Sequence, residues 1–569
     1  MLRILLCFLA FQTFAQIPTK TWRTHNNYVN LKGVEVVEKK IYAFSDNGFF
    51  YFDKLNKQVV KLSKADGLAE ANLAQVRYSP TRKKLLIAYE NGNLDLLEID
   101  SDGLPDGIHN IDFIKKTNTI QISKRINAIE FQGDFAYLAS DFGLVVLDTK
   151  KAEIKETYQN IGSGGKELSL KQLMFARDSI FVNTPDGILG ARFAPDVNLQ
   201  YYGNWKPVRN NRLFQPNAYP NDPLLINPIE IETDTDGKLW VADGESGLVS
   251  NWEGAFKSYS PNGIRGQVTG VFYSDSKTYS PAATIGNVFE NDAWKTLPLN
   301  QMPAYSNDIT DSYGFRWQIV SNGVRVTDNT TQQTRQYTIG RNTGNLPSSR
   351  VNTIAIDRDA TVWIGTNDGV AAVVTARDIF TRQVDAYTPF NSIGRRILLQ
   401  ETVSKIVVDG GNRKWIGTNN GLSLFTPTVD ELIENFTEEN SPLPVNEITD
   451  LSIDTPRGEI FVLTPKGLLS YQTDATEPKE DFSSVRIFPN PVRPDFHGVL
   501  TISGLRENSA VKITDAAGRL IYETKANGGT ASWNLKDSSI SRTVSGIYMV
   551  FSIAADGSES FVGKVAVVH

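Results

Sequence analysis

Histidine, the residue that most often carries acid–base chemistry or binds zinc, is scarce in this chain. The four histidines are His25, His109, His497 and His569, and none of them stands in a metal-ligand spacing. There is no His-Glu-x-x-His pattern and there is only one cysteine, so the usual sequence signs of a zinc site are missing. The sequence therefore predicts no metal and no cofactor, and it marks no catalytic residue.

Three loops could still hold an ion. The segment Gly162-Ser163-Gly164-Gly165-Lys166 lacks the first glycine of a phosphate-binding loop, and Glu167 stands where Ser or Thr must bind magnesium. Asp100-Ser101-Asp102-Gly103 and Asp234-Thr235-Asp236-Gly237 have the clustered carboxylates that calcium prefers, but no bidentate acid closes either loop. We interpret the first as an ordinary loop and the other two as hairpin turns.

Nothing singles out an enzyme. Scattered carboxylate pairs leave a glycosidase or lyase site open, yet no pair stands out, so we expect a non-catalytic protein whose ligand-binding residues are unknown. The formal net charge of −6 argues against a nucleic-acid partner, because phosphate binding needs a dense basic surface. We interpret the short basic spots Arg82-Lys83-Lys84 and Arg395-Arg396 as solvated faces.

The N-terminus reads as a signal peptide over residues 1–15. Arg3 precedes an apolar run from Ile4 to Phe11, and Thr13-Phe14-Ala15 supplies a small-residue cleavage site. The run is far shorter than the roughly 20 residues of a membrane span. The chain is therefore expected to be exported, and with Cys7 removed it must fold without disulfides.

A repeat runs through most of the sequence. In its clearest copies Asp357 precedes Trp363 by six residues and Gly369 follows by six, and Asp409, Trp415 and Gly421 repeat the spacing. The Asp–Trp part recurs at Asp234/Trp240 and Asp311/Trp317. A looser aromatic-or-apolar to Gly spacing places glycines at 48, 92, 143, 187, 247, 286, 323, 369, 421 and 467, with a mean step of about 47 residues.

This period is typical of β-propeller blades, which have four short strands each. Asn and Gly in the turns between strands tolerate positive φ. We interpret the repeated aromatic as packing between blades rather than as a sugar-binding face. The fold class is thus all-β, with ten blades in tandem propellers.

A different all-β pattern follows the repeats. Residues 476–483 read as a polar linker, and 484–569 as a β-sandwich with strands at 499–503, 510–515, 520–524, 531–534 and 546–553. The domain boundaries we expect are 1–15 for the signal peptide, 16–260 for an N-terminal propeller, 261–475 for a second propeller, then the linker and the sandwich.

The last domain resembles the C-terminal sorting domain of type IX secretion cargo from Bacteroidota. The resemblance rests on Phe488-Pro489-Asn490-Pro491, Lys512-Ile513-Thr514-Asp515-Ala516-Ala517-Gly518, Ser545-Gly546-Ile547-Tyr548 and Lys564-Val565-Ala566-Val567. One departure is Asn534-Leu535-Lys536-Asp537, where family members usually have a glycine beside the lysine. Together with residues 89–97, 412–418 and 488–498, it makes nearly the whole chain similar to the PorZ family of the type IX secretion system.

The resemblance implies a cell-surface protein of the outer membrane that works with a PorU-like sortase and a PorV-like barrel. It implies binding of anionic lipopolysaccharide, presented to the sortase for attachment to cargo, and a retained C-terminal domain. An ordinary cargo protein, an adhesin or carbohydrate-active enzyme with a cleavable sorting domain, is the alternative. A sensor-kinase ectodomain is disfavoured, since no transmembrane or kinase region follows the blades.

The blade count departs from the family. The resemblance implies two seven-bladed propellers, whereas ten repeats are recognisable, and the irregular spacing between 195 and 300 suggests where blades are missing. Propellers close with four to eight blades. We expect two five-bladed rings, with one ring of about seven blades and a partial partner as the alternative.

Overall fold

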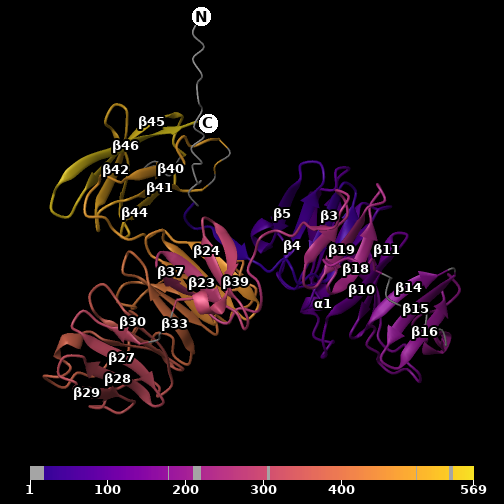
Figure 1. Ribbon diagram of the computed structural model, residues 1–569, viewed down its shortest axis with the longest axis horizontal. Helices are drawn as coiled ribbons and strands as arrows, with labels where there is room; N and C mark the ends of the chain where they lie inside the picture. The colour runs from indigo at the N-terminus through magenta and orange to yellow at the C-terminus, as the bar shows by residue number, and fades with distance from the viewer. Residues whose placement is uncertain are drawn as a thin grey trace, which may run out of the picture.

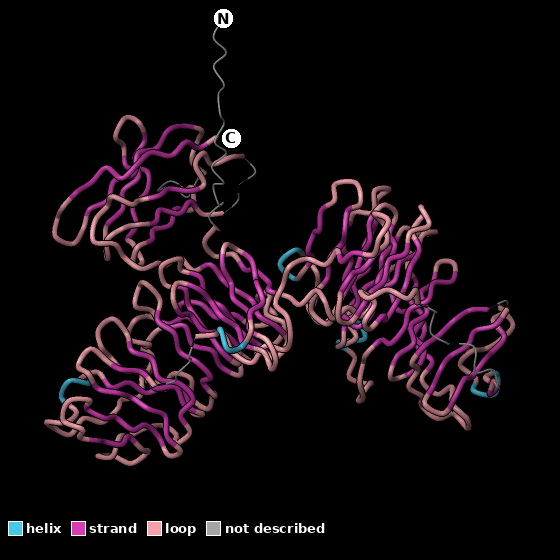
Figure 2. Tube along the Cα trace, in the orientation of Figure 1, coloured by secondary structure: helices cyan, strands magenta, loops and turns pink. Residues whose placement is uncertain are grey.

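The structure, a computed structural model, describes residues 18–568 except 177, 209–213, 215–218, 304–307, 495, 497 and 537–541. The expected signal peptide, residues 1–15, therefore lies outside the described residues. Strands dominate, and helix is confined to short segments (Figure 2). These are η1 (Lys64–Asp66), α1 (Phe113–Lys116), η2 (Tyr202–Asn204), η3 (Leu299–Gln301) and η4 (Ala376–Asp378). No described helix has the length and apolar character needed to cross a membrane.

The first five repeats form five antiparallel four-stranded sheets, blades 1 to 5 (Figure 1). Blade 1 is β2 (Gly33–Val37), β3 (Lys40–Phe44), β4 (Phe49–Asp53) and β5 (Gln58–Leu62); blade 2 is β6 (Leu73–Ser79), β7 (Lys84–Tyr89), β8 (Leu94–Ile99) and β9 (Pro105–Ile111). Blade 3 is β10 (Ile126–Gln132), β11 (Phe135–Ser140), β12 (Gly143–Asp148) and β13 (Glu153–Tyr158); blade 4 is β14 (Gln172–Ala176), β15 (Ser179–Thr184), β16 (Gly187–Arg192) and β17 (Lys206–Pro207). Blade 5 is β18 (Pro228–Thr233), β19 (Leu239–Asp243), β20 (Gly247–Ser250) and β21 (Lys257–Ser258).

The next five repeats form blades 6 to 10. Blade 6 is β22 (Phe272–Ser274), β23 (Lys277–Pro281), β24 (Gly286–Glu290) and β25 (Ala293–Leu297); blade 7 is β26 (Ile309–Thr310), β27 (Phe315–Val320), β28 (Gly323–Asp328) and β29 (Thr334–Tyr337). Blade 8 has three strands, β30 (Val351–Ile356), β31 (Val362–Thr366) and β32 (Gly369–Val373); blade 9 is β33 (Val403–Val408), β34 (Lys414–Thr418), β35 (Gly421–Phe425) and β36 (Leu432–Phe436). Blade 10 is β37 (Asp450–Asp454), β38 (Glu459–Thr464), β39 (Gly467–Gln472) and β1 (Trp22–His25).

The fourth strand of blade 10 comes from the other end of the chain. β1 pairs antiparallel with β39, from Trp22 opposite Tyr471 to His25 opposite Leu468. Residues 22–25 fall inside the predicted N-terminal propeller range 16–260, but they belong to the second propeller. The repeat pattern did not predict this strand, because one isolated strand carries no repeat. The lack of a fourth strand after Tyr471 is the signal in the sequence that another segment must complete blade 10.

Each propeller is a series of five blades joined by buried apolar cores. Shared cores link blades 4, 3, 2, 1 and 5 in that order, and blades 7, 8, 9, 10 and 6 in the second propeller. Within the described ranges no such core joins blade 4 to blade 5 or blade 6 to blade 7. The ten blades thus divide five and five, as expected, but within the described ranges no core closes either series into the predicted ring.

The six-residue spacing from Asp to Trp has one structural cause. In blade 7, Asp311 Oδ1 accepts the backbone N–H groups of Tyr313 and Phe315, each at 2.9 Å, and so folds the turn between β26 and β27. Its Oδ2 accepts the indole N–H of Trp317 at 2.8 Å. The same Oδ2–Nε1 bond occurs in Asp234/Trp240 (3.0 Å), Asp357/Trp363 (2.8 Å) and Asp409/Trp415 (3.2 Å). All four tryptophans are fully buried, which confirms their predicted packing role.

The glycine that follows each inner-strand aromatic has an equally local cause. Gly323 has φ +112°, and a Cβ there would lie 1.9 Å from the carbonyl oxygen of Tyr337 on the last strand of its blade. Gly421 has φ +129°, with Phe436 O at 2.4 Å from the same added atom. Only glycine lets the third strand begin this close to the fourth.

Residues 484–569 form the predicted β-sandwich. One sheet is β40 (Arg486–Phe488), β41 (Leu500–Ser503) and β44 (Thr530–Trp533); the other, in the order β43-β42-β45-β46, is β43 (Leu520–Lys525), β42 (Ala510–Asp515), β45 (Gly546–Ile553) and β46 (Glu559–Val567). The apolar core between them contains Trp533 and Tyr548. The five predicted strands are present, and β40 and β46 complete the two sheets.

Replacing Asp311 by Ala should destabilise the second propeller. The substitution removes two turn hydrogen bonds and leaves the buried Trp317 indole N–H without its acceptor, at a cost of about 3 kcal/mol. For a propeller of this size we expect a melting temperature lower by roughly 6–10 °C, measured by differential scanning calorimetry. Asp186→Ala, at an exposed turn position, is the control, and an equal shift in both variants would contradict the role of Asp311.

Candidate functional site

The innermost strands of the first propeller bring four carboxylates around one guanidinium. Arg77 on β6 lies 2.9 Å from Glu35 on β2, 3.5 Å from Glu130 on β10, and 3.5 and 3.8 Å from Glu230 and Glu232 on β18. Four blades therefore meet at one charged cluster, which we call the Arg77 cluster. It carries more negative than positive charge, as a candidate cation site would.

Two of these carboxylates also tie neighbouring blades together. Glu35 Oε2 accepts the backbone N–H of Tyr78 in blade 2 at 3.0 Å. Glu230 Oε2 accepts that of Val34 in blade 1, also at 3.0 Å. In the second propeller Asp450 Oδ2 accepts the N–H of Val271 at 3.0 Å. An acid on an innermost strand thus bonds the next innermost strand in both propellers.

Burial favours the protonated form of the glutamates in the Arg77 cluster. Desolvation raises the pKa of Glu35 to about 8, against the opposing charge of Arg77. Burial likewise raises the pKa values of Glu130, Glu230 and Glu232. The charge of Glu35 in turn raises the pKa of Arg77. At neutral pH the cluster is therefore a partly protonated network around a permanent cation.

A metal ion fits this cluster poorly. Carboxylate oxygens of Glu35, Glu230 and Glu232 lie within 4.8 Å of one another, a span that a divalent cation could bridge. Glu35 and Glu230, however, already accept backbone N–H groups, and Arg77 occupies the centre. We interpret the cluster as a structural network that joins the innermost strands of blades 1, 2, 3 and 5. The sequence analysis missed it, although an acid within an apolar inner strand, as in Ile129-Glu130-Phe131, is a usable signal.

His25 lies in the second propeller, buried in an aromatic group. Its Nε2 is 2.8 Å from Ser470 Oγ, and its ring contacts Phe289, Trp294 and Phe461 at centroid distances of 5.2 to 5.6 Å. Burial lowers the pKa of His25 well below its ordinary value, so the ring is neutral. It packs blade 10, to which β1 belongs, against blade 6. His109 lies on β9, far from this group in the sequence, and His497 and His569 lie outside the described residues.

The loops considered as ion sites are closed by their own backbone. Asp100 Oδ1 accepts the N–H groups of Asp102 and Leu104, each at 2.8 Å, and Asp234 serves its own turn in the same way. Gly162 N donates to Lys166 O at 3.0 Å, which folds the glycine-rich segment into a tight turn. These geometries are those of structural turns.

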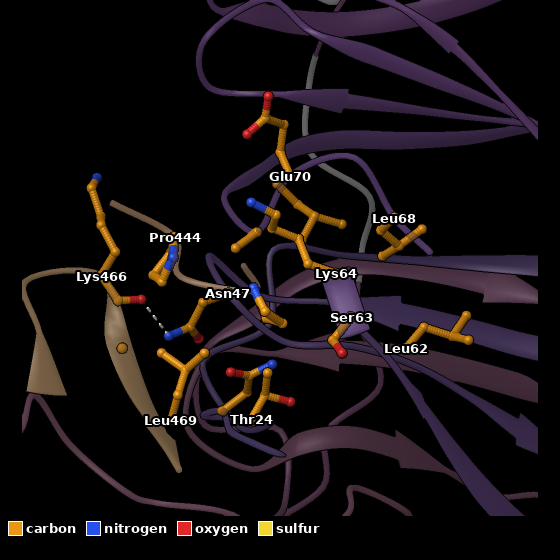
Figure 3. Close-up of a pocket in the computed structure, with 15 residues that line it drawn as sticks. Thr24, Asn47, Leu62, Ser63, Lys64, Leu68, Glu70, Pro444, Lys466 and Leu469 are labelled. Atoms are coloured by element: carbon orange, nitrogen blue, oxygen red, sulfur yellow. Dashed lines mark hydrogen bonds between the residues drawn. The ribbon is translucent and has the colours of Figure 1, made fainter. Parts of the chain in front are cut away.

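The two propellers meet at a tight seam, shown in Figure 3. Lys64 of the first propeller donates from Nζ to the carbonyl oxygens of Glu438 at 2.7 Å and Leu443 at 3.3 Å. Asn47 donates to the carbonyl of Lys466 at 2.9 Å. The space enclosed is about 20 Å³, room for about one water. Beside it, an open polar cleft of about 770 Å³ is lined by both propellers.

The Phe488-Pro489-Asn490-Pro491 motif protects an edge of the sandwich. Asn490 Nδ2 donates to Lys564 O at 2.9 Å, and Asn490 Oδ1 accepts from Ala566 N at 3.2 Å. Val492 continues the pairing by donating to Ala566 O at 2.8 Å. The motif therefore covers part of β46, the end strand of its sheet, where an open edge would invite pairing with another chain.

The sandwich is docked on the second propeller by close backbone contacts, which we call the junction. Gly529 N donates to Thr476 O at 2.8 Å, and the hydroxyls of Thr476 and Thr530 lie 2.7 Å apart. A Cβ on Gly410 would lie 1.9 Å from Thr476 O, and one on Gly528 would lie 2.3 Å from it. Thr476 is 8% exposed. The predicted linker 476–483 therefore begins at a buried residue whose hydroxyl and carbonyl groups bond to the sandwich.

Comparisons with known proteins agree with both ends of the chain. Residues 41–206 match the model of the N-terminal β-propeller domain of PorZ from the type IX secretion system. Residues 486–567 match that of the secretion system C-terminal sorting domain. The chain thus combines a PorZ-type propeller domain with a sorting domain, as its sequence predicted. No curated protein matches the chain.

Among solved structures, the chain is similar to PorZ of Porphyromonas gingivalis, an essential bacterial surface component of the type IX secretion system. The match has 19% identity and a TM-score of 0.65, and covers 96% of this chain and 100% of that one; it supports the tandem-propeller fold. Extracellular domains of two B. thetaiotaomicron proteins match at 12% and 13% identity with TM-scores of 0.25. They cover 95% and 98% of this chain and 86% and 92% of their own.

Replacing Glu35 by Gln should flatten the pH dependence of the first propeller. The folded chain holds the Glu35 proton up to about pH 8, whereas the unfolded chain loses it near the ordinary pKa of 4.5. Stability from this group is therefore lost as the pH rises between these values. Gln keeps an oxygen for the Tyr78 N–H but cannot titrate. We expect the melting temperature of E35Q to fall less than that of the wild type between pH 5 and 8.

The matched control is Glu153→Gln, at an exposed position of β13, which should keep the wild-type profile. Parallel wild-type and E35Q profiles would show that Glu35 does not hold a proton in the folded chain.

Proposed function

We propose that this protein is a non-catalytic surface component of type IX secretion that uses its sorting domain as a permanent part. The observation that carries the proposal is the junction. A cleavable domain needs a loose, accessible connecting segment. Here the segment begins at Thr476, which is buried against Gly410 and Gly528, and the exposed Glu477 and Lys479 that follow donate backbone hydrogen bonds to Thr455 O and Leu505 O at 3.0 and 2.9 Å. Proteolytic sites concentrate in exposed, weakly bonded backbone, whereas the start of this segment is buried or tied to both neighbouring domains by its backbone.

The remaining parts of the proposal come from the likeness to PorZ. We infer that the chain is exported by its signal peptide and resides at the outer-membrane surface. There it acts with a PorU-like sortase and a PorV-like barrel, binds lipopolysaccharide and presents it to the sortase. Because the chain has a net charge of −6, binding an anionic glycolipid requires a local basic surface or a bridging cation.

A cargo protein with a cleavable sorting domain is the second candidate. The two differ in what happens to other proteins. Deleting the gene in the bacterium that makes this chain should leave other sorting-domain proteins uncleaved and unattached to the surface, as immunoblots of cell and medium fractions would show. Normal maturation of those proteins would identify this chain as cargo instead.

The junction can be tested directly with Gly528→Val. The added side chain would collide with the carbonyls of Thr476 and Gly410, so the sandwich should detach. Its loss should expose Ala475 and Thr476 and free the backbone of Lys479, which donates to Leu505 O at 2.9 Å. We expect limited trypsin digestion to release the C-terminal domain at least tenfold faster than from the wild type, measured by intact-mass spectrometry.

Gly546→Ala is the control, since an added Cβ there comes no closer than 3.8 Å to another residue. The wild-type protein purified from the cell surface should retain residues 484–569. If it lacks them, the proposal of a permanent sorting domain is wrong.

A further inference from the structure

Blade 8 lacks a regular fourth strand. After β32 the chain makes a long excursion over residues 374–402, and only Tyr387 takes the place of the missing strand, through two 2.9 Å backbone hydrogen bonds with Ala372. The excursion includes a hairpin in which Phe390 pairs with Arg396. A groove of about 890 Å³ lies between this hairpin and the outer strands of blade 9.

The floor of the groove is one face of blade 9. Ser423 on β35 pairs with Asn435 on β36, and Phe425 pairs with Leu432, so these four side chains share a face. Asn435 Nδ2 donates to Ser423 Oγ at 2.9 Å. On the opposite wall Phe390 is 54% exposed, and Leu432 on the floor is 50% exposed. The groove therefore offers apolar surface beside polar groups.

The polar lining is of mixed kind and sign. Asn391, Ser392, Arg395, Arg396, Glu401, Asn420, Ser423, Asp430, Glu431 and Asn435 line it, against five apolar residues. The charged groups are two arginines and three carboxylates. A strongly anionic polymer would meet the carboxylates, and an acyl chain would bury too many unpaired polar groups. Amides and hydroxyls can both donate to and accept from sugar hydroxyl groups, and carboxylates accept from them.

We propose that this groove binds an oligosaccharide chain of low charge, with Phe390 lying against the apolar face of a sugar ring. Asn435 and Asp430 on the floor side would bond the sugar hydroxyls, in the manner of a mostly preformed site with a few converging polar groups. The inference rests on the proposed function, because it takes the sugar chain to be part of the lipopolysaccharide. It assigns the recognition to the neutral part of the glycan rather than to its anionic or lipid part.

The test measures calorimetric binding of the full exported chain to two probes. One is intact lipopolysaccharide from the bacterium that makes the protein, and the other is the soluble polysaccharide released from it by mild acid. Phe390→Ala and Asn435→Ala should each weaken polysaccharide binding about tenfold or more. Ile393→Ala, on the same hairpin, 71% exposed and not part of the groove lining, should bind as the wild type does.

Three outcomes would overturn the inference. If the wild type binds intact lipopolysaccharide but not the soluble polysaccharide, or if the groove variants bind both probes normally, the groove proposal fails and the proposed function stands. If the wild type binds neither probe, both the groove proposal and lipopolysaccharide binding fail. Normal melting temperatures of the variants show that a loss of binding is not a loss of folding.

Discussion

The buried aspartate in the first turn of blades 5, 7, 8 and 9 is the interaction on which the second propeller depends most. One carboxylate oxygen folds the turn and the other fixes the tryptophan that fills the gap between blades. A cation often joins the same group: Lys54 of blade 1 lies 2.9 Å from Asp234 of blade 5, and the fully buried Lys414 of blade 9 lies 2.7 Å from Asp357 of blade 8. Each such carboxylate therefore sets local geometry and joins two blades.

A second layer of carboxylates acts nearer the propeller axis. Glu35, Glu230 and Asp450 bond the next innermost strand, and Arg77 gathers four glutamates from four blades. Burying these acids is costly, and the raised pKa values of the glutamates express that cost. The arrangement is tolerated because each charge or proton has a defined partner, in a chain that has no pair of cysteines to form a disulfide.

The second propeller is the centre of the molecule. It receives β1 from the N-terminal end, contacts the first propeller at the seam of Lys64 and Asn47, and holds the sandwich at the junction (Figure 1). Arg413 shows how closely these roles combine, since it bonds Asp409 in its own turn and lies 2.6 Å from Asp474 just before the junction. The second propeller therefore holds the first propeller and the sandwich in a fixed arrangement.

The local units could be predicted from the amino-acid sequence, because their causes are local. Asp–Trp and aromatic–Gly spacings are set within one turn, so the ten blades and the tandem propellers could be predicted from them. The sandwich could be predicted from its alternating strands and the turn residues between them. The contacts that join the blades and domains to one another could be seen only in the tertiary structure. The pairing of β1 with β39, the Arg77 cluster, the Gly410–Thr476–Gly528 contact and the groove beside Phe390 unite residues far apart in the chain. No periodicity encodes those partners, since each depends on how whole blades pack.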